Sequence, residues 1–360
     1  MTKWYLFLLL TLFGASPVCK QQQDLSFTRI AFESNREGNW EIYTMNPDGT
    51  DQRNLTRNPS HDMDPVWSPD GTRIAFNSDR DANFRIFVMN ADGSDLTDVS
   101  GNMSCEGVTW SPDGTKIAFS SNGRGDAEIY AVNSDGSNLV NLTNNKASDT
   151  EPSWSPDGTR IAFASDRDKR WENTEVYVMN CDGTDPHNLT NNPAKDTHPS
   201  WCPDGKTIAF FSDRDEEKYI RPGRRPPKPM SRDIFVMNAD GTDQVNLTND
   251  EEWENRFCWS PDGRRIAFSS HRAVYVMDAD GTNKTCIASA AIQFDGPSWS
   301  PDGKKIVFYS IGGKYGDIYL VNSDGTDRVN LTNDPPFEGD PLWSPFQNTG
   351  TPPSPTAADR

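Results

Sequence analysis

The sequence predicts an all-β protein that folds as a seven-bladed β-propeller of four-stranded antiparallel blades. Three observations support this prediction: a tryptophan-containing motif recurs along the chain, short runs rich in Ile, Val, Phe and Tyr follow each copy, and Gly-containing turns separate those runs. The recurring unit is about 46 residues long, and a four-stranded unit of that length is typical of a propeller blade. The recurrent tryptophans are Trp67, Trp110, Trp154, Trp201, Trp259, Trp299 and Trp343.

The first strand of each unit ends at its tryptophan, and the turn Ser-Pro-Asp-Gly follows in most copies, as at residues 155–158. Proline presets φ at the second turn position, Asp can accept hydrogen bonds from the backbone, and Gly adopts positive φ. The next two strands are runs such as 160–163 and 175–180, and the second of these ends near an Asp-Gly turn. The short run Asn-Leu-Thr, as at 188–190, supplies the fourth strand. Such short runs, bounded by turn residues, are typical of strands.

The two ends of the repeat region predict how the ring closes. The first Ile-Ala-Phe run, at residues 30–32, has no tryptophan strand before it, and the last tryptophan strand, at 340–345, has no blade after it. We therefore expect the C-terminal strand to pair into the first blade, since a closed ring protects its sheet edges. The propeller is expected to span residues 24–346, and the polar, Pro-rich segment 347–360 is expected to be a disordered tail.

The N-terminus predicts export. Lys3 precedes an apolar run from Trp4 to Phe13, and small residues follow, so residues 1–19 are expected to be a signal peptide. The run is too short to span a membrane, and the rest of the chain contains no longer one. The protein is therefore expected in the periplasm or outside the cell, and not in the membrane. A lipid anchor at Cys19 is the alternative, although Val18 is larger than the residue that usually precedes a lipidated cysteine.

The charge of the chain limits its partners. The formal net charge is −18 at pH 7 and the sequence pI is about 4.6. Nucleic acid is not expected as a partner, because binding phosphates requires clustered Lys and Arg. Cations, basic segments and neutral sugars are compatible with such a surface.

The residues that most enzyme classes require do not occur in recognisable patterns. The four histidines are in no HExxH or Cys-His zinc pattern, and no GxSxG sequence marks a hydrolase nucleophile. The Asp-Arg-Asp sequences, as at 79–81, lack the spacing of a calcium loop. We therefore expect a non-enzymatic protein, without cofactor or bound metal.

The repeated pattern Trp-Ser-Pro-Asp-Gly, Ile-Ala-Phe, Ile-Tyr-Val-Met-Asn and Asp-Gly resembles the TolB-type propeller repeat, over roughly residues 24–345. The resemblance implies an envelope protein that acts through protein–protein contacts, with an envelope protein or a lipoprotein as its partner. The TolB-type family is related in architecture to WD-repeat propellers. We expect the protein to be a monomer. Two features differ from TolB itself: TolB carries an α/β domain before its propeller, and its propeller has six blades.

A second resemblance leaves an alternative function open. The repeats are also similar to those of seven-bladed oligogalacturonate lyases, which hold a metal in the channel with several histidines. Here only His61 and His198 are expected near the channel mouth. The alternative is therefore a polysaccharide-binding or lyase-type propeller, in which Trp40, Trp171 and Trp253 would stack on a glycan.

Acidic residues stand three and five positions before several of the recurrent tryptophans. The first strand of a blade lines the central channel, so these positions are expected to surround one mouth of the channel. One interpretation is that these residues are ordinary solvated carboxylates of surface loops. The functional hypothesis is that they form an acidic rim that captures a basic segment, a cation or a polar ligand. The predicted rim residues are Asp62, Asp64, Asp149, Glu151, Asp196, His198, Glu254, Glu338 and Asp340.

Two further features concern basic residues. An arginine recurs after the second strand, at positions such as Arg36 and Arg214, and is expected to form a repeated ion pair between blades. One blade also carries an insertion at residues 216–232, which is rich in Pro and in basic residues. It lies on the same face as the rim by connectivity, so it would either cover the rim or dock an acidic partner or an anionic envelope polymer. A tolerated, mobile loop insertion without a binding role is the alternative interpretation. Its candidate binding residues are Arg221, Arg224 and Arg225.

Overall fold

The computed structural model describes residue 25 and residues 28–81, 83–123, 125–168, 173–214, 232–250, 252–270, 273–289, 293–311, 315–333 and 337–346. The predicted signal peptide, Cys19 and the predicted tail lie outside these residues. So do Trp171 and the insertion residues Arg221, Arg224 and Arg225. Within the described part, no helix has the length and hydrophobicity that crossing a bilayer requires.

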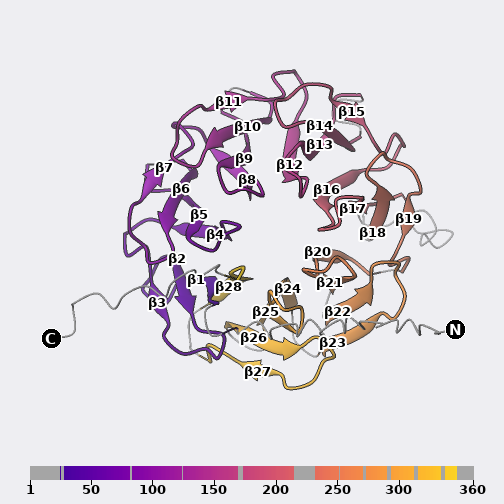
Figure 1. Cartoon of the computed structure of the whole chain (residues 1–360). Coiled ribbons are helices and arrows are strands. Elements are labelled where there is room, and N and C mark those ends of the chain that lie inside the picture. Colours follow the sequence, from indigo (N-terminus) through magenta and orange to yellow (C-terminus); the bar gives the residue numbers. More distant parts are fainter. Residues whose placement is uncertain are drawn as a thin grey trace, which may run out of the picture.

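The described chain forms seven four-stranded antiparallel sheets arranged in a ring (Figure 1). Blade one contains β28 (Glu338–Trp343), β1 (Ile30–Ser34), β2 (Glu41–Met45) and β3 (Arg53–Asn54). Blade two contains β4 (Asp62–Trp67), β5 (Arg73–Ser78), β6 (Arg85–Asn90) and β7 (Thr97–Asp98), and blade three β8 (Cys105–Trp110), β9 (Lys116–Ser121), β10 (Glu128–Asn133) and β11 (Val140–Asn141). Blade four contains β12 (Asp149–Trp154), β13 (Arg160–Ser165), β14 (Glu175–Asn180) and β15 (His187–Asn188).

The remaining three blades follow in the same order. Blade five contains β16 (Asp196–Trp201), β17 (Thr207–Ser212), β18 (Asp233–Asn238) and β19 (Val245–Asn246). Blade six contains β20 (Glu254–Trp259), β21 (Arg265–Ser270), β22 (Ala273–Asp278) and β23 (Thr285–Ser289), and blade seven β24 (Gln293–Trp299), β25 (Lys305–Ile311), β26 (Gly316–Asn322) and β27 (Val329–Asn330). The predicted fold, a seven-bladed propeller, is confirmed.

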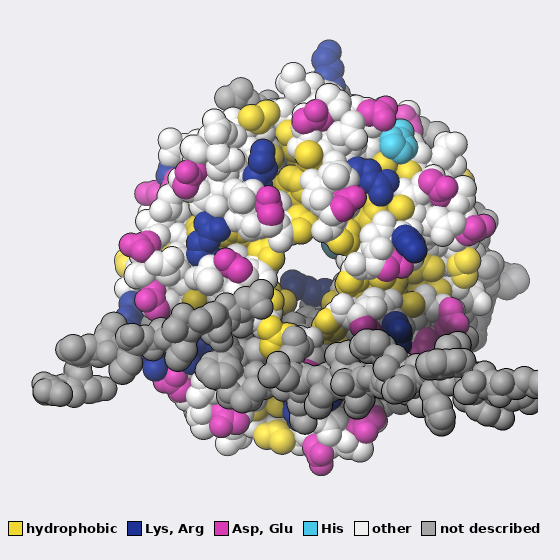
Figure 2. All heavy atoms as spheres, in the orientation of Figure 1, with side chains coloured by type: hydrophobic (Ala, Val, Ile, Leu, Met, Phe, Trp, Pro, Cys, Tyr) yellow, Lys and Arg dark blue, Asp and Glu magenta, His cyan; other side chains and the backbone are white. Residues whose placement is uncertain are grey.

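The ring closes as the sequence predicted. Strand β28, from the C-terminal end of the described chain, pairs antiparallel with β1, and Ile30 lies opposite Trp343. In Figure 1 the first strand of every blade lies nearest the axis and the fourth at the periphery. The space-filling view shows an opening at the centre of the ring (Figure 2).

The recurrent tryptophans pack between blades, where they are 5–9 % exposed. Four of them donate their indole N–H to a backbone carbonyl of the preceding blade; Trp67 bonds the carbonyl of Leu342, and Trp110 that of Val66. Each hydrophobic cluster also combines side chains of neighbouring blades, as Ile42 of blade one and Phe76 of blade two do. No blade buries its own faces alone, so stability comes from the stacking of neighbours.

The Gly-containing turns have the predicted geometry. In the turn after Trp67, the Gly71 N–H donates to the Ser68 carbonyl at 2.8 Å, and the Asp70 carboxylate accepts from the Ser68 hydroxyl and the Thr72 amide. At the turn between β6 and β7, Gly93 has a φ of +87°, and a Cβ there would lie 2.8 Å from the Leu55 carbonyl oxygen of blade one. Glycine is therefore required for both conformation and close approach.

Candidate functional site

The innermost strands share one irregularity, which positions the candidate site. The residue three positions before the tryptophan has positive φ in six blades, and the pairing of the first and second strands shifts register beside it. This conformation is unfavourable for Glu and His, and such strain is often found at functional sites. The six residues are Asp64, Gly107, Glu151, His198, Gly296 and Asp340, and Arg256 occupies the seventh position. We call these seven positions the inner ring.

Contacts within the inner ring cross blade boundaries. The His198 amide donates to Glu151 Oε2 at 2.6 Å, and His198 Nδ1 lies 3.1 Å from Glu151 Oε1. Burial and the guanidinium groups of Arg232 and Arg256 lower the pKa of His198 to about 4. The imidazole is therefore neutral at neutral pH, so its 3.1 Å contact with the Glu151 carboxylate is not an ion pair.

A group of three carboxylates lies where blades one and two meet. Glu33, Asp64 and Asp340 each place one oxygen within 4.8 Å of the others. Glu33 Oε1 accepts the backbone N–H of Asp64, and Arg256 pairs with Asp340. Burial and the nearby Asp340 carboxylate raise the pKa of Glu33 to about 8. At neutral pH this carboxyl group therefore holds a proton, which relieves the repulsion within the group.

A cavity of about 530 Å³ opens between the inner strands of blades five and six. Arg232, which precedes β18, stacks with its guanidinium 4.1 Å from the centre of the Phe211 ring and donates to the carbonyls of Glu254 and Asn255. Phe257 packs edge-on against Phe211, with ring centroids 4.9 Å apart. The cavity is lined by His198, Ser200, Phe211, Arg232, Asn255, Arg256 and Phe257, and we call it the mouth pocket.

The mouth pocket contains two guanidinium groups although the protein is strongly acidic, and that of Arg256 is paired with Asp340. The described lining also includes one neutral imidazole and two aromatic rings, and none of its residues carries a carboxylate. Arginine binds carboxylates in a fork geometry and stacks on planar groups. The arrangement is therefore suited to an anionic or planar polar group.

The acidic residues five positions before the tryptophans are buried. Asp62, Asp149, Asp196 and Glu338 are fully shielded from solvent, and each pairs with a recurrent arginine. The N–O distances are 2.9, 3.0, 2.9 and 2.7 Å to Arg80, Arg167, Arg214 and Arg36. These four carboxylates thus do not face the channel mouth.

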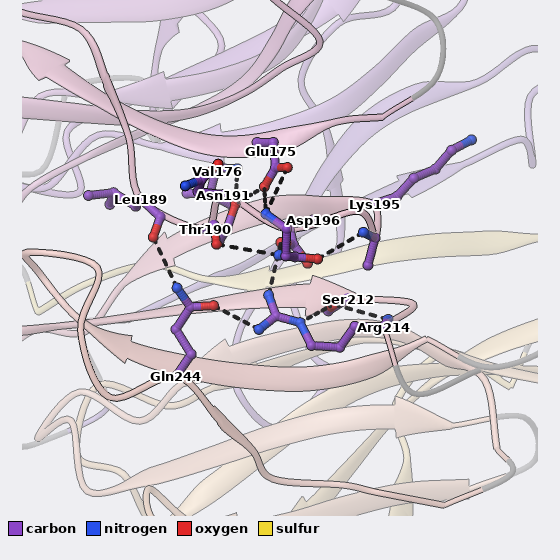
Figure 3. A network of polar contacts seen from close by, with 12 residues as sticks. Glu175, Val176, Leu189, Thr190, Asn191, Lys195, Asp196, Ser212, Arg214 and Gln244 are labelled. Atoms are coloured by element: carbon purple, nitrogen blue, oxygen red, sulfur yellow. Dashed lines mark hydrogen bonds and ion pairs between the residues drawn. The ribbon is translucent and has the colours of Figure 1, made fainter. Parts of the chain in front are cut away.

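The expected arginine ion pairs are present, but they lie within one blade and not between blades. Arg214 and Asp196 belong to the same sheet, and the Arg214 guanidinium stacks over the rings of Phe210 and Phe235. The link between blades comes from the loop before β16, where the side-chain amide of Asn192 donates to Asp196 (Figure 3). The Asn192 backbone N–H donates to Glu175 of blade four. A polar chain thus connects neighbouring blades.

The structure divides the predicted rim into two sets. Asp64, Glu151, His198 and Asp340 join the inner ring, whereas Asp62, Asp149, Asp196, Glu254 and Glu338 are buried. Sequence reasoning missed Arg256, Glu33 and the two phenylalanines of the mouth pocket. Asp64 and Arg256 occupy the same position, three residues before Trp67 and Trp259. Arg256 was missed because the prediction rested mainly on acidic residues at that position.

Comparisons with known proteins agree with this fold. Residues 26–108 and 102–172 match the TolB beta propeller domain, and residues 155–276 match the dipeptidyl peptidase IV N-terminal region. No curated protein sequence matches the chain significantly.

Solved structures with the same fold have different activities. TolB from Acinetobacter baumannii is 20 % identical, with a TM-score of 0.55 over 89 % of this chain and 68 % of its own. Oligogalacturonate lyase from Vibrio parahaemolyticus is 14 % identical, with a TM-score of 0.60 over 84 % and 85 %. A puromycin-hydrolyzing peptidase from Mycobacterium tuberculosis is 15 % identical, with a TM-score of 0.64 over 88 % of this chain and 55 % of its own.

At these identities the structural likeness establishes the fold alone. The repeat itself matches the TolB propeller model across the first blades, and the same motif continues through the ring. The chain is a seven-bladed β-propeller whose residues 26–172 match the TolB beta propeller domain.

Proposed function

We propose that the protein is an exported, non-enzymatic interaction propeller of the bacterial envelope that binds an acidic segment of a partner protein in the mouth pocket. The observation that carries this proposal is the pair Arg232 and Arg256, which lie with Phe211 and Phe257 around one cavity of about 530 Å³. A partner carboxylate would lie between the guanidinium groups, where it would compete with Asp340 for Arg256, and its neighbouring side chains would pack on the rings.

The inner ring supplies the polar surroundings of the proposed contact. Asp64, Glu151, His198 and Asp340 lie in the same ring of positions as Arg256, so backbone amides of an extended segment would find acceptors beside the mouth pocket. The basic insertion ends at Arg232, and its residues Arg221, Arg224 and Arg225 would add positive charge to the same partner contact. The buried carboxylates hold the blades together in this proposal and do not touch the partner.

The proposal is tested by affinity capture from an envelope extract at low and moderate salt. We expect the Arg256→Glu variant to lose partners that the wild-type protein retains, because reversing the charge repels a carboxylate. Arg53→Glu is the matched control, since Arg53 is exposed on the peripheral strand β3. Loss of the same partners from both variants, or from neither, would contradict a role for the mouth pocket.

An acidic polysaccharide is the second candidate ligand. One structural relative is named oligogalacturonate lyase, and a uronate carboxylate presents the same charge as an acidic side chain. Calorimetric titration with an oligogalacturonate distinguishes this ligand from a protein segment. Formation of unsaturated sugar products in the same mixture would overturn the non-enzymatic part of the proposal.

A further inference from the structure

The junctions between blades repeat one polar arrangement. At three junctions an asparagine in the loop before the inner strand donates its side-chain amide to the buried aspartate that begins that strand: Asn58 to Asp62, Asn145 to Asp149, and Asn192 to Asp196. The same aspartate also pairs with the recurrent arginine of its blade. The buried carboxylate thus has two donors, which offset the cost of removing it from water.

The junction between blades five and six departs from this arrangement. Asp250 stands at the position of the asparagine, and Glu254 at the position of the buried aspartate. Glu254 is fully shielded from solvent, and neither of its carboxylate oxygens has a hydrogen-bond partner among the described residues. A buried carboxylate without donors carries a large desolvation penalty.

The nearest described cation does not satisfy Glu254. The ammonium of Lys284 lies over the rings of Phe268 and Tyr275, at the place that an arginine takes in other blades. Its ion pair is with Asp250, at 2.6 Å. Lys284 thus lies over the aromatic rings without a direct contact to the Glu254 carboxylate. The recurrent arginine of this blade, Arg272, lies outside the described residues.

A third carboxylate completes the group. Asp233, at the start of β18, is buried and accepts hydrogen bonds from Asn246 Nδ2 at 2.8 Å and Thr248 Oγ1 at 3.1 Å. Asp233, Asp250 and Glu254 each place one oxygen within 4.8 Å of the other two. Counted over the described residues alone, three ionised carboxylates and Lys284 would leave a net charge of −2 at a largely buried junction.

We propose that Asp233, Asp250 and Glu254 bind a divalent cation of the oxygen-preferring class, Ca²⁺ in the first instance, between blades five and six. All candidate ligands are carboxylate oxygens, which Ca²⁺ prefers, and the donor set contains no His or Cys. Ca²⁺–oxygen distances are about 2.3–2.6 Å, so oxygens on opposite sides of the ion are roughly 5 Å apart, which matches the span of the group. The ion would join the two blades where the asparagine contact is missing.

The inference is independent of the proposed function. The candidate ligands are not in the lining of the mouth pocket, and a protein that binds no partner there could still bind the cation. The alternative state of the group is a proton on Glu254, which would remove one negative charge without any ion.

The test uses the full mature chain, freed of metal with EDTA, and measures thermal unfolding and calorimetric binding with CaCl₂ or MgCl₂ alone. We expect one Ca²⁺ per chain and a midpoint of unfolding that rises with the Ca²⁺ concentration. Glu254→Gln should lower the Ca²⁺ affinity at least about tenfold, because mutating a residue that merely hydrogen-bonds a metal ligand already lowers metal affinity by that factor.

Asp250→Asn restores the residue that the three other junctions use. This variant should be at least as stable as the metal-free wild type, and Ca²⁺ should no longer raise its midpoint of unfolding. Asp185→Asn is the matched control, because Asp185 is exposed and has positive φ that asparagine also adopts; it should respond to Ca²⁺ as the wild type does.

Three results would overturn the inference. The first is a wild-type midpoint that neither Ca²⁺ nor Mg²⁺ changes, which would leave a proton as the counter-charge. The second is a full Ca²⁺ response in both Asp250→Asn and Glu254→Gln, which would place the ion elsewhere. The third is an equal loss of response in Asp185→Asn, which would indicate general surface binding.

Discussion

Arg256 and Asp340 form a two-point ion pair although a complete blade separates the strands that carry them. Nη1 lies 3.1 Å from Oδ1, and Nη2 lies 3.3 Å from Oδ2. Blade seven stands between these strands and has Gly296 at the equivalent position, where a Cβ would lie 3.5 Å from Asp340 Oδ1. Residues two blades apart can meet in this way because all the inner strands lie around one axis (Figure 1).

Gly296→Ala is expected to destabilise the protein by about 1 kcal/mol. Gly296 has a φ of +58°, which an alanine adopts only with strain, whereas the added methyl group would meet the Asp340 carboxylate at an ordinary contact distance of 3.5 Å. The free energy of unfolding in urea measures the effect. Gly296→Asn is the control for conformation, because asparagine tolerates positive φ; equal stability of the alanine variant and the wild type would contradict the strain argument.

Asp196→Ala is expected to cost about 3–5 kcal/mol, because it leaves the Arg214 guanidinium without its buried carboxylate. Arg53→Ala removes a peripheral partner of Asp51, whose ion pair is exposed, and should cost less than about 1 kcal/mol. Urea unfolding of both variants tests the difference. Similar losses would mean that burial of the repeated carboxylate–arginine pairs adds nothing to the stability of a blade.

The sequence predicted the architecture because the same residues recur with the same spacing in every blade. Trp67 and the turn after it are informative, because a residue that every blade requires occurs once in each blade and the repetition makes its role visible in the sequence. The candidate site depends on what differs between blades, and a single Arg256 or Asp250 has no second copy to reveal its role. The burial of Asp196 was missed for a related reason: spacing places the residue near the mouth, but it does not show the arginine that faces it.

His198 is expected to remain neutral from about pH 5 upward, because its pKa is lowered to about 4 by burial and by Arg232 and Arg256. An unfolded histidine has a pKa near 6.5. The unfolded chain therefore binds more protons between about pH 4 and 6.5, so this residue lowers the stability of the fold as the pH falls through that range.

NMR titration of the His198 imidazole measures this pKa directly. Arg256→Gln removes one nearby positive charge, so the pKa of His198 should rise toward its ordinary value in that variant. The matched control is Arg53→Gln, which leaves the inner ring unchanged. A pKa of His198 near 6.5 in the wild-type protein would contradict the described surroundings of the imidazole.

The metal-free protein is expected to lose stability as the pH rises from about 5 to 9, and Glu254 should account for part of that loss. Burial, together with the carboxylates of Asp250 and Asp233, raises the pKa of Glu254 to about 9, and Lys284 only partly opposes them. The folded state therefore holds a proton that the unfolded state has already released, and one such proton contributes at most about 1.4 kcal/mol per pH unit.

Urea unfolding in EDTA across this pH range tests the prediction by comparing the wild type with Glu254→Gln. Glu33 has a raised pKa as well, so the total slope is not diagnostic, whereas the difference between the two proteins isolates Glu254. We expect the glutamine variant to have the shallower slope. Added Ca²⁺ should flatten the wild-type curve at high pH, because the ion replaces the proton as counter-charge. Parallel curves for both proteins would mean that Glu254 is ionised in the fold and has a donor of its own.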